Sequence, residues 1–122
     1  MDRHNWSVIP LEKLNPLAER RVIHTAGLTV AKLTLKKGAI VPLHHHENEQ
    51  ITMMESGVLR FEIAGESIVL RAGDVLPIPP DVPHMVEALE DSLATDVFTP
   101  AREDWMRGDD AYLRSGLATT HP

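Results

Sequence analysis

The sequence contains no cysteine and few aromatic residues, namely two Trp, one Tyr and two Phe among 122 residues. Without cysteine, neither a disulfide framework nor a thiolate metal site is possible. No segment approaches the roughly 18 consecutive apolar residues of a membrane span, and residues 1–6 lack the apolar stretch of a signal peptide. The formal net charge of −6 argues against nucleic acid and anionic membranes as partners. We therefore expect a cytoplasmic protein.

The composition is that of an ordinary globular domain, with 43% hydrophobic and 25% charged residues. A chain of this length has room for one domain with a real core and not for two. We expect a single domain over residues 1–122. Its core should lie at about 22–98, followed by a C-terminal segment at 102–114 and a loose tail at 115–122.

Short stretches of β-branched and apolar residues, separated by Gly, Pro and Asp turns, predict strands throughout that core. In residues 58–63 three apolar side chains alternate with Arg60 and Glu62, the period-two pattern of a half-buried strand. Strands at this spacing predict an all-β sandwich or barrel. Residues 55–57 are expected to be a hairpin turn, and only residues 102–114 have helical character, interrupted by Gly108. The expected strands are 28–35, 51–54, 58–63, 67–70, 75–78, 85–89 and 93–98.

The run His44-His45-His46, with His84 further along the chain, is the most informative chemical feature. Side chains at i and i+2 of an extended segment share a face, so His44 and His46 can converge while His45 points away. The imidazole of His84 and the amide oxygen of Gln50 would complete a mixed shell of nitrogen and oxygen donors. Such a shell suits one divalent ion of Zn, Fe, Ni or Mn better than Mg or Ca.

A proline-rich turn precedes His84. Pro79, Pro80 and Pro83 lack a donor N–H and fix φ, so this segment should be a rigid turn outside the sheet. A stiff turn beside a metal ligand lowers the entropy cost of holding the imidazole in place.

A second group of candidate residues lies at 96–102. Asp96 and Phe98 are at i and i+2 of an expected strand, so both face inward if Val97 faces out. A charged group inside a small barrel is costly unless it is paired or used, which makes Asp96 a candidate functional residue. Taken from the residues alone, Asp96 can also be an exposed edge-strand residue, and Arg102 can be a surface salt-bridge partner.

The spacing around the histidines resembles the two motifs of the cupin superfamily over about residues 22–98. Gln50 stands where the family's acid sits, Asp81 replaces a turn glycine and Ala88 replaces a closing asparagine. An amide in place of the acid leaves a bound metal with one more unit of positive charge. The residues that carry the resemblance are Gly38, His44, His46, Gln50 and Gly57 in the first motif, and Gly73, Pro79, Asp81 and His84 in the second.

A closer resemblance extends past the core. The pattern D-x-F-x-P-x-R at residues 96–102, followed by E-D-W at 103–105, is similar to the small pectin-degradation cupins of the KdgF type. This resemblance implies a single-domain jelly-roll barrel that binds one divalent metal ion and linearises 4,5-unsaturated uronates to open-chain keto-uronates. It also implies metal ligands at His44, His46, Gln50 and His84, and functional side chains at Asp96, Phe98 and Arg102.

The side chains suit that chemistry. Arg102 can hold a substrate carboxylate in a bidentate fork. The metal can bind the hydroxyl or carboxylate oxygens of the sugar and lower the pKa of a bound hydroxyl or water. Asp96 can act as general base or acid, and Phe98 can pack against the sugar face and exclude water.

Two other classes of function remain open. A cupin site with three histidines can serve a dioxygenase using Fe or Ni, although the few aromatic residues supply an aromatic-lined pocket poorly. A non-catalytic module that binds a small molecule or metal is the second alternative, with Asp96 and Arg102 then forming only an orienting salt bridge. The resemblance further implies a homodimer, to which a strand at about residues 6–9 can contribute by adding to a partner's sheet edge.

Overall fold

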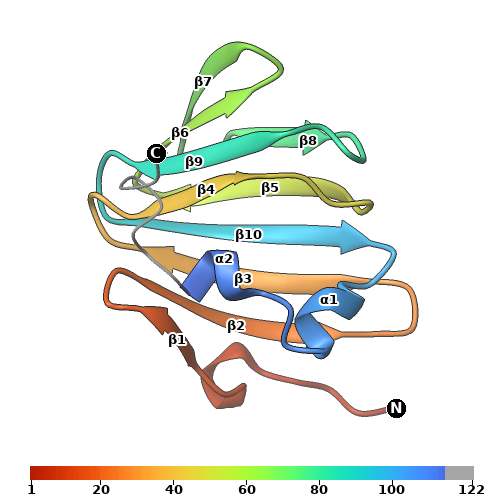
Figure 1. The fold of residues 1–122 in the computed structure, drawn as a ribbon. Helices are drawn as coiled ribbons and strands as arrows, with labels where there is room; N and C mark the ends of the chain where they lie inside the picture. Colours follow the sequence, from red (N-terminus) through yellow and green to blue (C-terminus); the bar gives the residue numbers. More distant parts are fainter. Residues whose placement is uncertain (115–122) are drawn as a thin grey trace.

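Two antiparallel β-sheets, packed against one another, form the body of the protein (Figure 1). The computed structural model describes residues 1–114 of the chain. The larger sheet has six strands in the order β1-β2-β3-β10-β5-β8. These are β1 (Glu12–Asn15), β2 (Ala18–His24), β3 (Thr29–Leu35), β10 (Ser92–Thr99), β5 (Glu49–Ser56) and β8 (Val75–Ile78).

The smaller sheet has four strands in the order β4-β9-β6-β7. Apart from β1-β2-β3 and β6-β7, neighbouring strands are not consecutive in sequence, because from β3 onward the chain passes repeatedly from one sheet to the other, as in a jelly roll. The expected all-β fold is therefore confirmed. The four strands are β4 (Ile40–His44), β9 (His84–Ala88), β6 (Val58–Ile63) and β7 (Glu66–Arg71).

Strand alternation decides which side chains fill the space between the sheets. In β6, Leu59, Phe61 and Ile63 are buried while Glu62 is exposed. β6 and β8 have the bounds that the sequence predicts, and the other expected strands differ by one or two residues at their ends. β1, β2 and β4 were not expected. Because β1 starts at Glu12 and β2 at Ala18, the sheet begins before the expected core boundary at residue 22.

Gly57 lies where the chain crosses between the sheets. The expectation of a hairpin turn at residues 55–57 is wrong, because β5 pairs with β8 and β10 while β6 pairs with β7 and β9. Gly57 has a φ of +85°, a left-handed conformation that glycine adopts without a steric penalty. The chain does turn at Gly57, as the sequence predicts, but the turn residues do not determine which strands pair.

The N-terminal segment is not a strand. Trp6–Val8 forms a 3₁₀ turn, η1, whose N-cap Asn5 accepts a hydrogen bond from the amide of Ser7 at 2.9 Å. An asparagine at the cap satisfies the first free amide of the turn and so favours it over an extended segment. The predicted strand at residues 6–9 is therefore wrong, and the predicted homodimer has to be tested without it.

The C-terminal segment forms two one-turn helices, α1 (Glu103–Met106) and α2 (Ala111–Arg114), on either side of Gly108 at a φ of +81°. The expected interruption at Gly108 is confirmed. A buried ion pair between Arg20 of β2 and Asp110 fastens this segment, and α2 contacts both β1 and β4. The expected tail at 115–122 lies outside the described residues. Within the described part of the chain, no helix is long and apolar enough to span a membrane.

Replacing Gly57 by Ala should destabilise the fold much more than replacing Gly65. Both glycines have positive φ, so either alanine meets a left-handed strain of about 1–2 kcal/mol. A Cβ at position 57 would also overlap the carbonyl oxygen of Asp91 and lie 2.6 Å from Cα of Ser92, whereas nothing lies within 4 Å of it at position 65.

We expect the free energy of unfolding in urea to fall by more than about 3 kcal/mol for Gly57→Ala and by about 1 kcal/mol for Gly65→Ala. Equal losses in the two variants would show that the crossing at Gly57 is not as tight as described.

Candidate metal centre and cavity

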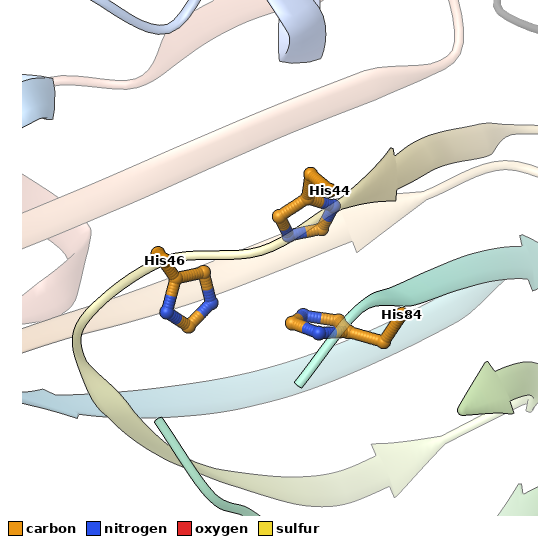
Figure 2. A group of neighbouring side chains, drawn as sticks. All are labelled: His44, His46 and His84. Carbon is orange, nitrogen blue, oxygen red and sulfur yellow. The ribbon is translucent and has the colours of Figure 1, made fainter. Parts of the chain in front are cut away.

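Three histidines meet where β4 ends and β9 begins. His44 is the last residue of β4 and lies directly across from His84, the first residue of β9. His46 follows two residues later in the loop, and Figure 2 shows the three rings turned toward a common point. One nitrogen from each ring lies within 4.8 Å of the others, so the three rings can hold one metal ion.

The backbone fixes which nitrogen each ring presents. A carbonyl oxygen only accepts, so the Nδ1 atom that contacts it must carry the proton, and Nε2 of the neutral ring keeps its lone pair. Such outer partners also hold a metal-binding ring in its orientation. The contacts are His44 Nδ1 to the carbonyl of Pro42 at 2.7 Å, His46 Nδ1 to that of Asn48 at 3.0 Å, and His84 Nδ1 to that of Val82 at 2.8 Å.

The surroundings keep all three rings neutral. Burial, followed by the charge of His84, lowers the pKa of His44 to about 3. Burial and then the charge of Arg102 lower the pKa of His46 to about 4, and burial also lowers the pKa of His84. Because only a neutral imidazole can bind a metal, the rings are in the ligating form at neutral pH.

The amide oxygen of Gln50 lies beside the histidines, where the sequence predicts an oxygen donor. Gln50 points inward from β5, and its Oε1 lies 3.0 Å from Nε2 of His46. Since both atoms are acceptors when the ring is protonated at Nδ1, a cation between them satisfies the pair better than any hydrogen bond. Three imidazole nitrogens and one amide oxygen suit a divalent ion such as Zn, Fe, Ni or Mn. The four residues thus fit the predicted metal, whose ligation by Gln50 stays a prediction.

His45 points away from this group. Its side chain is 67% exposed and its Nδ1 lies 4.0 Å from a carboxylate oxygen of Asp81. The strand alternation predicted for the three histidines therefore holds. Asp81, which replaces a turn glycine of the cupin motif, has a φ of +63°, a conformation that aspartate tolerates better than most residues.

Asp96 is buried on the inward face of β10, as alternation predicts. Its Oδ1 accepts a hydrogen bond from the hydroxyl of Thr52 at 2.7 Å. Burial raises the pKa of the Asp96 carboxyl to about 6, against the lowering effects of the Thr52 hydrogen bond and the charge of Arg102. Asp96 is therefore a carboxylate at neutral pH that needs little free energy to take up a proton, as a general acid or base should.

Arg102 is buried between two aromatic rings. Its guanidinium carbon lies 4.7 Å from the centre of the Phe98 ring and 4.4 Å from that of the Trp105 ring. Phe98 in turn meets the ring of His46 edge to face, with centroids 5.7 Å apart. Cation–π contacts of this kind stabilise a desolvated guanidinium. The interpretation of Arg102 as a surface salt-bridge partner is thus wrong, because its side chain is 1% exposed.

The bidentate fork of Arg102 is already occupied. Nε donates to Oδ1 of Asp104 at 2.9 Å, and Nη2 donates to Oδ2 of the same carboxylate at 2.7 Å. Nη2 also donates to the hydroxyl of Tyr112 at 2.8 Å. The expectation that this fork receives a substrate carboxylate therefore needs correction. Within residues 1–114, Nε and Nη2 already have hydrogen-bond partners, and Nη1 is the nitrogen that remains for a ligand. Arg102 therefore offers a substrate its charge and one nitrogen.

A single cavity brings most of the predicted residues together. It is lined by His44, Gln50, His84, Asp96, Phe98 and Arg102, along with apolar side chains of both sheets. His46 borders an adjacent surface depression that includes Asp104. Three of the four proposed metal ligands, the buried carboxylate and the buried guanidinium therefore share one cavity.

Sequence reasoning did not single out Thr52, Trp105 and Tyr112, whose side chains bring further polar groups to the lining of this cavity. Thr52 lies two residues after Gln50 on the same face of β5, so the period of two could have found it. Trp105 was noted only as part of the E-D-W pattern at residues 103–105, and its place in the cavity was not expected. Tyr112 stacks on His44 with ring centroids 4.9 Å apart, and nothing in its local sequence indicates that α2 reaches the histidines.

Comparison with known proteins settles the family. A family model described as a cupin domain matches residues 31–98, which is more than half of the chain. The chain belongs to the cupin family. Among curated proteins, none matches this cupin.

Several solved structures are similar to this cupin, and one of them is an enzyme described with Mn(II) centres. KdgF from Halomonas sp. is 32% identical, with a TM-score of 0.74 over 79% of this chain and 92% of that one. An RmlC-like cupin from Shewanella frigidimarina is 27% identical, with a TM-score of 0.79 over 84% of this chain and 93% of that one. Oxalate decarboxylase from Bacillus subtilis, described with Mn(II) centres, is 25% identical, with a TM-score of 0.71 over 80% of this chain and 29% of that one.

Removing the imidazole of His46 or His84 should lower the affinity for a divalent metal by more than about 100-fold, since each replacement by Ala removes a direct ligand. His45→Ala should leave metal content unchanged, because that ring faces solvent. Metal content per chain after dialysis against a weak chelator measures both. Loss of metal in His45→Ala together with retention in His44→Ala would overturn the assignment.

Proposed function

We propose that this cupin is a metal-dependent enzyme acting on a small carboxylated sugar, and that it linearises 4,5-unsaturated uronates to open-chain keto-uronates. The observation that carries the proposal is the cavity that His44, Gln50 and His84 share with Asp96, Phe98 and Arg102. The 32% identity to KdgF, over nearly all of that chain, supports the choice of substrate. The proposed metal is Zn, Ni, Fe or Mn.

A metal ion held by His44, His46, Gln50 and His84 would polarise sugar oxygens and lower the pKa of a bound hydroxyl or water. Proton transfer and positioning of the sugar would depend on the side chains of the cavity. Ring opening of such a sugar needs a proton removed from the hemiacetal hydroxyl and a proton delivered to the alkene, without any redox step.

Asp96 has the properties of the proton carrier. Its carboxylate lies in the cavity, away from bulk water, and a pKa of about 6 lets it both accept and return a proton near neutrality. The hydrogen bond from Thr52 to Oδ1 holds the carboxylate in one orientation.

Arg102 and Phe98 would position the sugar. The charge of Arg102 attracts the uronate carboxylate, and Asp104 together with Tyr112 keeps the guanidinium from rotating. Phe98 presents a buried apolar ring beside it, against which a sugar face can pack. Both residues act in binding and in the exclusion of water.

The proposal is tested with the metal-loaded protein and a panel of unsaturated uronates, by following the loss of their enol absorbance. Turnover with a keto-uronate product supports it. Oxygen consumption with bound Fe or Ni would favour a dioxygenase instead. Tight uronate binding without turnover would favour a non-catalytic binding module.

Replacing Asp96 by Asn should lower turnover by a factor of about 10² to 10⁴, because the amide keeps the shape but cannot accept a proton. Metal content should not change, since Asp96 is not proposed as a ligand. Asp109→Asn removes an exposed carboxylate and serves as the control. Steady-state kinetics decide the matter, and a wild-type rate for Asp96→Asn would remove this residue from the mechanism.

Replacing Arg102 by Lys should raise KM for a uronate more than it lowers kcat. The ammonium keeps the positive charge but cannot hold Asp104 in a fork or lie flat between two rings, so the charge is less well placed. We expect an increase in KM of about 10-fold or more. An unchanged KM would show that Arg102 has a structural role alone.

A further inference from the structure

A line of buried hydrogen bonds joins the proposed oxygen ligand to the carboxylate. Nε2 of Gln50 donates to the hydroxyl of Thr52 at 3.0 Å, and that hydroxyl lies 2.7 Å from Oδ1 of Asp96. Thr52 is 1% exposed, and both of its partners are buried. Water therefore has little access to these polar atoms, and each must be satisfied by the others.

The direction of these hydrogen bonds follows from counting protons. A carboxylate can only accept, so the single proton of the Thr52 hydroxyl goes to Asp96. The hydroxyl oxygen must then accept from Gln50, which places the NH₂ end of the amide on the side of Thr52. A hydrogen bond from Gln50 that lowers the pKa of Asp96 agrees with this orientation.

The other end of the amide is thereby turned to the histidines. Oε1 of Gln50 faces Nε2 of His46 at 3.0 Å, and that nitrogen has no proton because Nδ1 donates to the carbonyl of Asn48. The opposite orientation would let the NH₂ group donate to Nε2 of His46. That hydrogen bond would satisfy the metal-free site and would occupy the lone pair that a metal needs.

We propose that Thr52 is a positioning residue that holds the Gln50 amide with its oxygen toward the metal site, using Asp96 as the terminal acceptor. The inference rests on the metal centre of the proposed function and not on its substrate. Without the hydroxyl, the Gln50 amide loses its hydrogen bond to Thr52, keeps only its interaction with Asp96, and is freer to rotate and to bond His46. An amide needs this restraint because its two ends differ, whereas the two oxygens of a carboxylate are equivalent.

The experiment compares Thr52→Val, which removes the hydroxyl at nearly constant volume, with Thr52→Ser, which keeps it. Zn²⁺ affinity is measured at pH 8 by competition with a chelator, and the visible absorption of bound Co²⁺ reports the ligand set. We expect Thr52→Val to weaken Zn²⁺ binding by about 10–100-fold and to alter the Co²⁺ spectrum, as is typical when an outer partner of a ligand is lost. Thr52→Ser should stay within about 3-fold of wild type.

Thr95→Val is the matched control, because its hydroxyl donates to the carboxylate of Glu55 on the same two strands but away from the cavity. It should leave Zn²⁺ affinity unchanged. In a Gln50→Glu background, Thr52→Val should change the Zn²⁺ affinity by less than about 3-fold, since either oxygen of a carboxylate can bind the metal. If Thr52→Val does not fold, Thr52→Ala provides the same loss of the hydroxyl.

Wild-type Zn²⁺ affinity and Co²⁺ spectrum in Thr52→Val would overturn the inference and leave the proposed function standing. An equal loss in the Gln50→Glu background would also overturn it, because Thr52 would then act otherwise than through the amide. A metal-loaded wild type without turnover on any uronate would overturn the proposed function alone.

Discussion

The antiparallel register between β5 and β10 is the constraint on which the cavity depends. Gln50 lies opposite Phe98 and Thr52 lies opposite Asp96, so two adjacent cross-strand pairs place all four side chains on the inward face. Because side chains alternate along a strand, a slip of one residue would move all four to the outer face. β10 is held on both sides, by β3 and by β5, which makes such a slip costly. The same alternation sends His44 inward and His45 to solvent on β4 and the loop that follows.

Burial gives these side chains their chemical character. The imidazoles of His44 and His46 are neutral well below physiological pH because desolvation disfavours their charged form. The same effect raises the pKa of Asp96 toward neutrality. The guanidinium of Arg102 stays protonated in this buried setting because it forms an ion pair with Asp104 and lies between two aromatic rings. The site therefore combines neutral imidazoles, one carboxylate with a raised pKa and one buried guanidinium held by Asp104.

The sequence predicts those features of the site that depend on strand alternation or on the preference of a single residue. The histidine spacing, the inward face of Asp96 and Phe98, and the break at Gly108 all follow from alternation or from single-residue preferences. It does not predict contacts made by tertiary packing. The pairing across Gly57, the polar strand β2 and the approach of Tyr112 to His44 depend on segments distant in the chain. The occupied fork of Arg102 belongs to the same class, since Asp104 two residues away looks like an ordinary surface acid in the sequence.

The amide at position 50 links the charge of the centre to its proposed ligand. Three neutral imidazoles and a neutral amide leave the full charge of a divalent ion on the site, with Asp96 as the nearby carboxylate of the cavity. Even with Arg102 paired to Asp104 and with Asp96 ionised, a bound divalent ion would leave the site with an excess of positive charge, which favours an anionic ligand such as a uronate. An acid at the same position would reduce that excess by one unit and weaken the attraction. The cost of the amide is that it must be held by its correct end, and the Thr52 hydroxyl between Gln50 and Asp96 is placed to do so.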